Sequence, residues 1–368
     1  MKIASFFSGA GGLDLGFTNA GFEIVFANDN WRGCWETFEK NHGLSINKKS
    51  ITEVSPDEIP EVIGFIGGPP CQSWSLAGAM RGINDPRGRL FYNYVNLIKA
   101  KQPLFFLAEN VAGILSPTHY SEFLKIVEAF KKIGYNVSYK LLDAKYYGVP
   151  QERKRVIIVG YHEKLGKSFE FPPASLRLFT LKESIGDLPE SVSAKEKNKT
   201  NKTLKVSNHE HMNGGFSTIY MSRNRVRAWN EQSFTIQAGG RHAPIHPQAP
   251  KMKFIEQNNR EFVKGKEHLY RRLSVRECAR IQTFPDDFIF YYNDVADGYK
   301  MIGNAVPVKF AEAIAKKIMV DLKNIEPKDK ILAKQAESQE NKQHLTDFTR
   351  LHLAQSKFAL QTSLNHIR

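Results

Sequence analysis

Short apolar runs alternate with stretches of helical periodicity along the first 160 residues of the chain. Each apolar run has the length of a buried strand, and each amphipathic stretch has the length of a helix. The pattern predicts strands within the stretches 3–7, 23–29, 62–68, 104–110 and 155–160, the fourth ending before Glu109, and helices at 13–21, 31–42, 90–101 and 120–133. Alternating strands and helices are typical of an α/β fold with a mostly parallel, doubly wound, Rossmann-like sheet.

The pattern changes near residue 172, where prolines and the lysine-rich stretch "SAKEKNKTNKTLK" interrupt the alternation. We therefore expect a first domain over 1–171 and a smaller, loop-rich, basic domain over 172–300. The segment "GYKMIGNAVPVKFAEAIAKKIM" predicts a strand or turn followed by a helix, so 301–325 is expected to return to the first domain. Residues 326–368 are polar and weakly amphipathic, and this tail has no recognisable chemistry.

The composition of the chain indicates which kind of partner it binds. The chain has 368 residues, 41% of them hydrophobic, and a net charge of +14 that is typical of proteins that meet phosphates. No apolar stretch approaches the roughly 18 residues of a membrane span, and glycines interrupt the start where a signal peptide would need an apolar run. We expect a cytoplasmic protein that binds nucleic acid and no membrane.

Three cysteines, Cys34, Cys71 and Cys278, are too few and too scattered for a disulfide framework or a zinc site, and no metal is expected. Cys34 and Cys278 lie in helical patterns, where cysteine usually behaves as a small buried apolar residue. Cys71 differs because Pro69 and Pro70 end the strand before it. Its thiol is expected on a loop at a strand end, where it can share one crevice with Glu109, which follows the next strand.

The opening "FFSGAGGLDLGF" is expected to form a glycine-rich turn between a strand and a helix, which brings backbone amides close to a ligand. The dinucleotide fingerprint G-x-G-x-x-G fails, because Asp14 stands where the third glycine belongs. Asp29 ends the second strand, where a carboxylate can hold ribose hydroxyls. The turn therefore suits an adenosine cofactor other than NAD.

Six motifs together resemble the DNA cytosine-5 methyltransferase family over about residues 1–320. They are "FSGAGGLDLGF", "GGPPCQSWS", "ENV", "QERKR", "RLSVRECARIQTFPDDF" and "GNAVP", in that order. The basic segment "MSRNRVRAWNEQSFTIQAGGRHAPIHPQAP" further resembles the target-recognition region of restriction–modification enzymes that methylate GGCC.

The chemistry explains why such an enzyme needs these residues. Carbon 5 of cytosine is too weakly nucleophilic to attack a methyl sulfonium until a thiolate, here Cys71, adds at carbon 6. Glu109 would neutralise the charge at ring nitrogen 3, provided that burial raises its pKa from about 4.3. Arg153 and Arg155 would orient the base and Glu109, with Arg155 favoured by the resemblance. The sequence does not identify the base that removes the carbon 5 proton; water is a candidate.

The resemblance implies S-adenosylmethionine as the methyl donor. Its adenine would lie against Phe7, its methionine part beside the glycine turn, and its ribose at Asp29. The expected cofactor residues are Phe7, Gly9, Gly11, Leu13, Asp29, Asn30, Ser50 and Asn304. Three positions depart from the family pattern: Ser50 and Ile63 replace aspartates, and Thr283 replaces a glycine. Losing the charge at Ser50 predicts cofactor binding weaker by about 1–2 kcal/mol.

The target base must leave the duplex to reach the crevice, so the substrate is expected to be double-stranded DNA with a flipped cytosine. Residues on and near the glycine-rich stretch after Cys71 would contact phosphates. These are Ser75, Arg81, Arg87 and Arg89. In the second domain, Arg225, Arg227 and Arg241 are candidates for contacts with guanine O6 and N7.

Three other interpretations stay open at this point. One branch of the family methylates tRNA, and a catalytically silent DNA-binding protein would keep the same fold. The first 30 residues alone also suit an NAD-dependent oxidoreductase, although the failed fingerprint and the basic second domain disfavour it. We expect a monomer, and no stable complex with a cognate restriction endonuclease.

Overall fold

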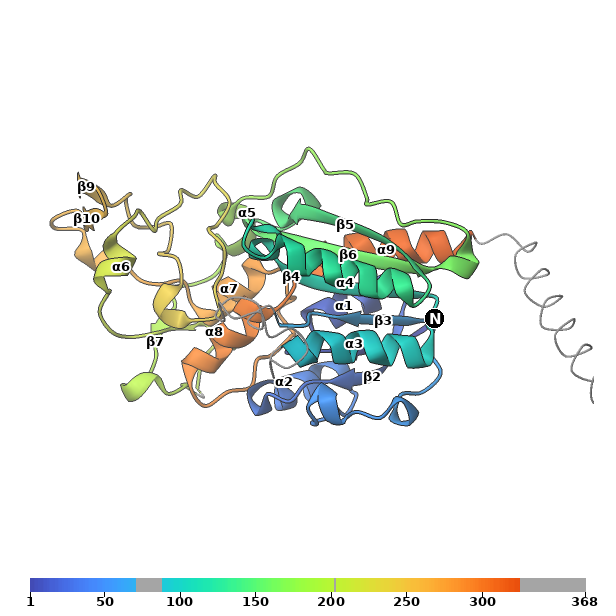
Figure 1. The fold of residues 1–368 in the computed structure, drawn as a ribbon. Coiled ribbons are helices and arrows are strands. Elements are labelled where there is room, and N and C mark those ends of the chain that lie inside the picture. Colours follow the sequence, from blue (N-terminus) through green and yellow to red (C-terminus); the bar gives the residue numbers. More distant parts are fainter. Residues whose placement is uncertain (71–87, 202, 325–368) are drawn as a thin grey trace, which may run out of the picture. The chain divides into compact units, whose positions relative to one another are not determined.

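A computed structural model of the chain describes residues 1–70, 88–201 and 203–324, and residues 1–319 form one compact unit. Its central sheet has six strands in the order β2-β1-β3-β4-β6-β5 (Figure 1). The strands are β1 (Lys2–Phe6), β2 (Glu23–Asn28), β3 (Gly64–Gly67), β4 (Phe105–Val111), β5 (Tyr135–Asp143) and β6 (Lys154–His162). The four strands β2, β1, β3 and β4 are parallel, whereas β6 runs antiparallel to β4 and β5. The predicted α/β fold with a mostly parallel sheet is confirmed.

Two details of the sheet differ from the sequence pattern. Strand β5 was not predicted, because its sequence mixes partly buried and exposed positions and has no continuous apolar run. Glu109 was expected just past the end of its strand, but β4 continues to Val111. The reason is the antiparallel partner β6, whose Arg155 pairs with Val111 and so extends the ladder beyond the apolar run.

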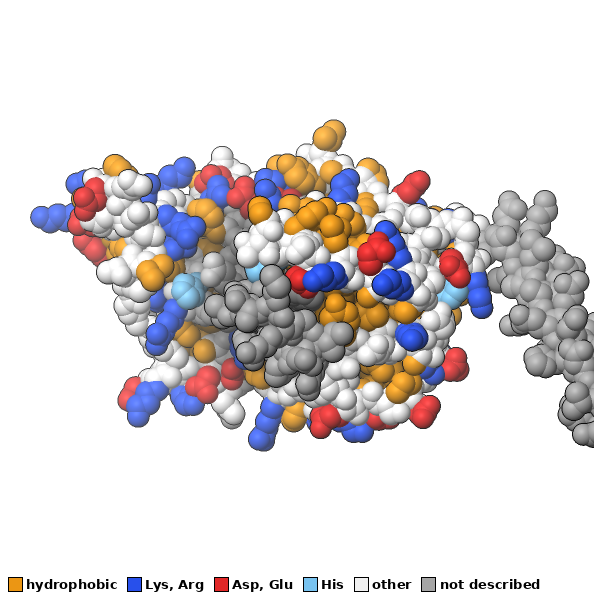
Figure 2. Space-filling view, in the orientation of Figure 1, with side chains coloured by type: hydrophobic (Ala, Val, Ile, Leu, Met, Phe, Trp, Pro, Cys, Tyr) orange, Lys and Arg blue, Asp and Glu red, His pale blue; other side chains and the backbone are white. Residues whose placement is uncertain are grey.

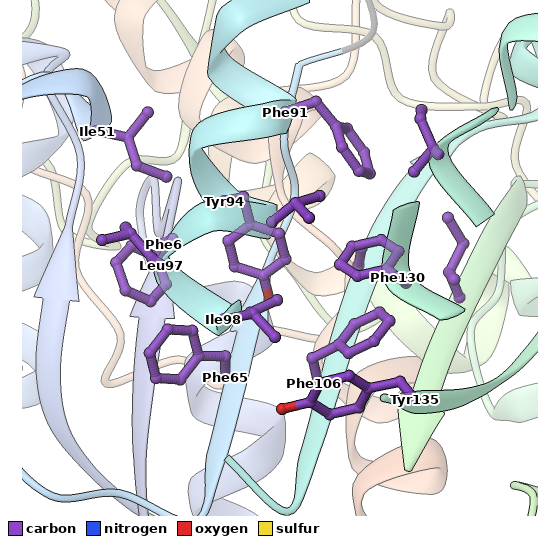
Figure 3. Packing of buried hydrophobic residues seen from close by; sticks show 14 of the residues in the cluster. Phe6, Ile51, Phe65, Phe91, Tyr94, Leu97, Ile98, Phe106, Phe130 and Tyr135 are labelled. Atoms are coloured by element: carbon purple, nitrogen blue, oxygen red, sulfur yellow. The ribbon is translucent and has the colours of Figure 1, made fainter. Parts of the chain in front are cut away.

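Helices cover both faces of the sheet. The first four are α1 (Gly12–Asn19), α2 (Arg32–His42), α3 (Gly88–Lys101) and α4 (Tyr120–Lys132). Aromatic and aliphatic side chains of α3 and α4 pack on alternate strand residues such as Phe65 and Phe106, as Figure 3 shows. On the other face, Phe17 of α1 stacks on Phe105. Because Phe105 and Phe106 are neighbours on one strand, they point to opposite faces and serve the two layers.

The second half of the chain contains short elements joined by loops. They are α5 (Leu181–Ile185), β7 (Val192–Ser193), β8 (Glu210–His211), α6 (Thr218–Met221), β9 (Lys253–Glu256), β10 (Asn259–Glu261), α7 (Val275–Ile281) and α8 (Val295–Asn304). A small hydrophobic cluster that includes Tyr220, Ile245 and Tyr270 lies within residues 216–270. By contrast, α7 and α8 share a larger cluster with Ala10 and Cys34. Residues 275–304 thus pack with the first part of the chain.

The segment after residue 298 was expected to begin with a strand or turn, which is wrong: its start belongs to α8. A short turn then leads to α9 (Val308–Lys323). The helix packs against α1 as expected, since a Cβ on Gly16 would collide with Ala311. Cys34 in α2 and Cys278 in α7 are fully buried, which confirms their structural interpretation. Among the described helices, none is long and apolar enough to cross a membrane.

Candidate active site

The site begins where β3 and β4 lie side by side. Their parallel register pairs Gly67 with Ala108, which sets Gly68 beside Glu109. A Cβ on Gly68 would lie 3.4 Å from Glu109 Oε2. Asn110 Nδ2 also donates a hydrogen bond to the carbonyl oxygen of Pro69 at 3.1 Å. The "ENV" motif therefore contacts the segment that leads to Cys71, which itself lies outside the described residues.

Glu109 and Arg155 form an ion pair, with Arg155 Nε 2.7 Å from Glu109 Oε1. The geometry follows from the antiparallel ladder: Arg155 lies opposite Val111, two residues beyond Glu109, so all three side chains share one face. The two side chains are only 12% and 11% exposed. Burial strengthens a charge-assisted hydrogen bond and fixes its direction.

Arg153, two residues earlier, has different contacts. It is fully buried and donates hydrogen bonds to the carbonyl oxygens of Ile236 at 2.9 Å, Gly303 at 2.8 Å and Ala305 at 3.0 Å. Burial, with the charge of Arg155 in addition, lowers the pKa of its guanidinium well below the ordinary value. Of the two arginines expected to orient Glu109, Arg155 contacts it, whereas Arg153 donates its hydrogen bonds to backbone carbonyl oxygens.

An open cavity of about 570 Å³ adjoins Arg155. Its lining includes Val111, Lys145, Glu152 and Thr235 together with Arg155. Sequence reasoning assigned no role to Lys145, Glu152 or Thr235. Glu152 stands inside "QERKR" and Thr235 inside the basic segment, so position in a motif was the available signal. Lys145 lies in none of the motifs, and its neighbours in the cavity come from other segments of the chain, so no signal in the sequence pointed to it.

The glycine turn lies at the ends of β1 and β2. Gly9 and Gly11 adopt positive φ values of 56° and 86°, which glycine tolerates without strain. Gly9 N donates to Asp29 Oδ2 at 2.9 Å, and Trp31 N donates to Asp29 Oδ1 at 2.8 Å. Burial raises the pKa of Asp29, while these two backbone bonds oppose the shift. The turn and the expected ribose ligand are thus joined directly.

The other expected cofactor residues surround this turn. Phe7 has a positive φ of 53° and packs on the sheet core, and Leu13 is buried at the start of α1. Asn304 is exposed at the end of α8, and the two residues after it, Ala305 and Val306, contact Gly12. These positions gather around one end of the sheet.

Asn30 is exposed next to Asp29, and Asn28 Nδ2 donates to the carbonyl oxygen of Lys49, which brings Ser50 near the end of β2. Ser50 caps the short helix η1 (Ile51–Glu53), and its hydroxyl lies 2.9 Å from Thr52 Oγ1. Ile63 immediately precedes β3, and its N–H donates a hydrogen bond to the carbonyl oxygen of Lys2 at 2.9 Å.

Sequence reasoning missed Asp14 as a chemical group. It lies in the first turn of α1, is fully buried, and neither carboxylate oxygen has a hydrogen bond of acceptable geometry in the described part of the chain. Burial raises its pKa from 3.8 to about 7, the nearby Asp29 charge adds to the shift, and the Ser5 hydroxyl opposes it. In the sequence, Asp14 is informative only because it breaks the G-x-G-x-x-G spacing. The residue type alone does not reveal that its carboxyl group is buried.

The arginines expected to read bases are held in different ways. Arg225 donates to the carbonyl oxygens of Tyr220 at 2.8 Å and Ile219 at 3.2 Å. Arg227 forms ion pairs with two glutamates, described below, and Arg241 is exposed in η9 (Gly240–His242).

Figure 2 shows Lys and Arg side chains around α6 and the β9–β10 hairpin. Ser75, Arg81, Arg87 and the side chain of Arg89 lie outside the described residues. Within the described ranges, no group of three or more His, Cys, Asp or Glu side chains is arranged to hold a metal ion.

Comparison with known proteins identifies the family of the chain. Residues 1–320 match the family described as C-5 cytosine-specific DNA methylase. The chain is similar to the type II methyltransferase M.MthTI of Methanothermobacter thermautotrophicus, with 67% identity over 88% of this chain and 99% of that protein. It is also similar to M.FnuDI of Fusobacterium nucleatum, another type II methyltransferase, with 56% identity over 86% of this chain and 94% of that protein.

Solved structures share the fold at lower identity. A DNMT2 mutant of Spodoptera frugiperda has a TM-score of 0.65 at 19% identity, over 87% of this chain and 99% of that one. The methyltransferase EhMeth of Entamoeba histolytica has a TM-score of 0.64 at 16% identity, over 88% of this chain and 98% of that one. Because the family match spans the sheet, the glycine turn and the Glu109–Arg155 pair together, this chain belongs to the C-5 cytosine-specific DNA methylases.

Proposed function

We propose that this enzyme transfers a methyl group from S-adenosylmethionine to carbon 5 of a flipped-out cytosine in double-stranded DNA, within GGCC. The observation that carries the chemistry is the buried Glu109–Arg155 pair beside the segment that leads to Cys71. We infer that it protects host DNA in a restriction–modification system, since similar proteins are named type II methyltransferases. A cytoplasmic monomer that forms no stable complex with its endonuclease suffices for this role.

In the proposed reaction the Cys71 thiolate forms a bond to carbon 6 of cytosine, and the ring electron pair moves towards carbon 5. Glu109 holds a proton at ring nitrogen 3, and Arg155 fixes the direction of the Glu109 carboxyl group. Carbon 5 would bond to the methyl group while the carbon–sulfur bond of the sulfonium breaks and its electron pair stays on sulfur. A base then removes the proton that carbon 5 still carries. The electron pair then returns to the ring and expels the Cys71 thiolate.

The residues around the glycine turn fit S-adenosylmethionine, which supplies an electrophilic methyl group when bound. Each Asp29 oxygen accepts one backbone hydrogen bond, and a carboxylate oxygen has a further lone pair for a ribose hydroxyl. Phe7 offers an aromatic face, Gly9, Gly11 and Leu13 border the turn, and Asn30, Ser50 and Asn304 complete the proposed set. An aromatic face for the adenine and a carboxylate for the ribose suit an adenosine.

Recognition of GGCC is proposed for residues 172–300, of which 275–300 pack with the first part of the chain, and 1–171 and 301–325 are proposed as the catalytic part. The small hydrophobic cluster within 216–270 supports a recognition unit with its own core. Arg225, Arg227 and Arg241 would contact guanines, while Ser75, Arg81, Arg87 and Arg89 would contact phosphates. The resemblance of the basic segment to GGCC-specific enzymes supports the site.

The test is transfer of labelled methyl groups from S-adenosylmethionine to duplexes that contain GGCC or a scrambled site, with Cys71→Ala as the control. Transfer confined to GGCC and lost in the variant supports the proposal, and transfer to another sequence overturns the assigned site. Transfer to tRNA but not to DNA would identify the tRNA branch, and no transfer with retained DNA binding would identify a silent binding protein.

The covalent step has a separate test. A GGCC duplex with 5-fluorocytosine at the target position retains its fluorine, so the final elimination is blocked and an adduct accumulates. We expect a denaturation-resistant complex with the wild type and none with Cys71→Ala. Methylation without such a complex would contradict the covalent mechanism while leaving the activity intact.

A further inference from the structure

We propose that Glu152 is a positioning residue that holds Arg227 ready to contact DNA and ties this arginine to the catalytic strand β6. This inference rests on the proposed function, because it concerns recognition of the methylation site. Arg227 Nη2 lies 2.6 Å from Glu152 Oε2, although the residues are 75 positions apart. Glu152 stands just before β6, the strand that carries Arg155.

Arg227 is constrained on three sides. Besides Glu152, it contacts Glu231, with Nη1 3.3 Å from Oε1, and its guanidinium lies over the Phe234 ring at 4.2 Å. Each Nη atom carries two hydrogens, so one remains on Nη1 and one on Nη2 after these two bonds. A bidentate contact with guanine O6 and N7 requires two N–H donors of one guanidinium, and this number remains. The carboxylates therefore orient the arginine and leave it able to bind a base.

Glu152 itself is held by backbone contacts with the recognition segment. Its N–H donates to the carbonyl oxygen of Ser233 at 3.0 Å, and its carbonyl oxygen accepts from Thr235 Oγ1 at 2.6 Å. The preceding residue, Gln151, accepts from the N–H of Ile236 at 2.8 Å. This pairing does not involve the Glu152 carboxylate, so a change at the carboxylate leaves the attachment of the segments in place.

The residue proposed to contact a base and the catalytic carboxylate are held by two side chains that lie close together in the sequence. Glu152 contacts Arg227, and Arg155, three residues along the same chain, contacts Glu109. Glu152 and Arg155 also line the same cavity. An ion pair formed before DNA arrives reduces the rotamer entropy that Arg227 would otherwise lose on binding. This saving in entropy strengthens binding only at sites where Arg227 contacts its base. It therefore increases discrimination between the preferred site and other sequences.

The test compares Glu152→Gln with wild type on the preferred duplex and on duplexes with one base pair changed. We expect KM for the preferred duplex to rise about three- to tenfold, with the same loss in discrimination by kcat/KM. Binding to unrelated DNA should stay equal or tighten, because the variant loses a negative charge. Glu163→Gln makes the same charge change away from Arg227 and serves as the matched control.

A double-mutant cycle separates positioning from general stability. In the Arg227→Met background, Glu152→Gln should no longer alter discrimination, because the arginine that Glu152 positions is absent, whereas the contact of Glu152 with Lys145 at 3.4 Å is lost in both backgrounds. An undiminished effect in that background, or unchanged discrimination in the single variant, would overturn the inference. Failure of the proposed function appears differently, since the wild type itself would then show no preference for GGCC. Unfolding midpoints of all variants confirm that they fold.

Discussion

Replacement of Asp14 by asparagine tests the electrostatics beneath the glycine turn. Asp14 is fully buried at the start of α1, and Asp29 lies close enough to raise its pKa further. Asparagine keeps the size and shape of the side chain but cannot ionise. The variant therefore removes a titration from the core without opening a cavity.

The magnitude follows from the pKa of Asp14, which is 3.8 as the ordinary value and about 7 in the folded protein. Between these pH values the unfolded chain ionises while the folded protein still holds the proton. The protonated Asp14 therefore contributes its full stability below the pKa that it has in the unfolded chain. This contribution is lost as the pH rises to the pKa that Asp14 has in the folded protein. A shift of about 3 units corresponds to about 4 kcal/mol of unfolding free energy.

Urea unfolding followed by tryptophan fluorescence at several pH values between about 4 and 8 measures this effect. Asparagine adds a constant cost of about 1–3 kcal/mol if its amide stays unpaired, so the readout is the change with pH. Relative to wild type, Asp14→Asn should gain about 4 kcal/mol across this range. Asp287→Asn, at an exposed position, is the control. A difference between Asp14→Asn and wild type that is constant with pH would refute the reasoning.

Four further outcomes follow from the same structure. Burial lowers the pKa of His42 from 6.5 to about 4, so the stability that its neutral form contributes is lost as pH falls through this interval. In His42→Gln, the unfolding free energy measured with urea should therefore fall less steeply between these pH values, by about 1.4 kcal/mol per pH unit. Calorimetry of Ser50→Asp should show S-adenosylmethionine binding about tenfold tighter, and an unchanged Kd contradicts the assigned role. Arg155→Lys loses the Nε contact with Glu109 and should lower kcat about 10- to 100-fold in the methyl-transfer assay. Thr283→Ala should cost about 1–2 kcal/mol in urea unfolding, whereas Thr283→Gly should change stability by less than about 1 kcal/mol.

The sheet could be predicted because burial leaves a local trace. Strands β1 to β4 and helices α1 to α4 show their periods within short windows of the sequence, and most predicted boundaries lie within about two residues of those observed. Strand β5 lies at the sheet edge, where only its first residue and Leu142 are buried, so its period is weak. The extension of β4 to Val111 depends on β6, a partner that no local window contains.

The site was predictable only as far as motifs reach. Glu109 and Arg155 belong to short motifs, and the structure places them in contact. The contacts of Arg153 lie 83 and 150 or more residues away, so its commitment to backbone carbonyls is a property of the fold. The same holds for Glu152 and Arg227, whose pairing depends on the alignment of two distant segments.

Thr283 shows how a departure from the family pattern acquires a local explanation. Its φ of 63° is a left-handed conformation, which a β-branched residue adopts at a cost that glycine avoids. The Thr283 hydroxyl accepts a hydrogen bond from Lys309 N at 2.9 Å, in the first turn of α9. The N–H groups of a first helical turn lack partners within the helix, so Thr283 satisfies one of them. Glycine would relieve the strain and lose this bond. The threonine therefore bears on how α9 is held against the loop that follows α7, and Ser50 is the departure to test for cofactor affinity.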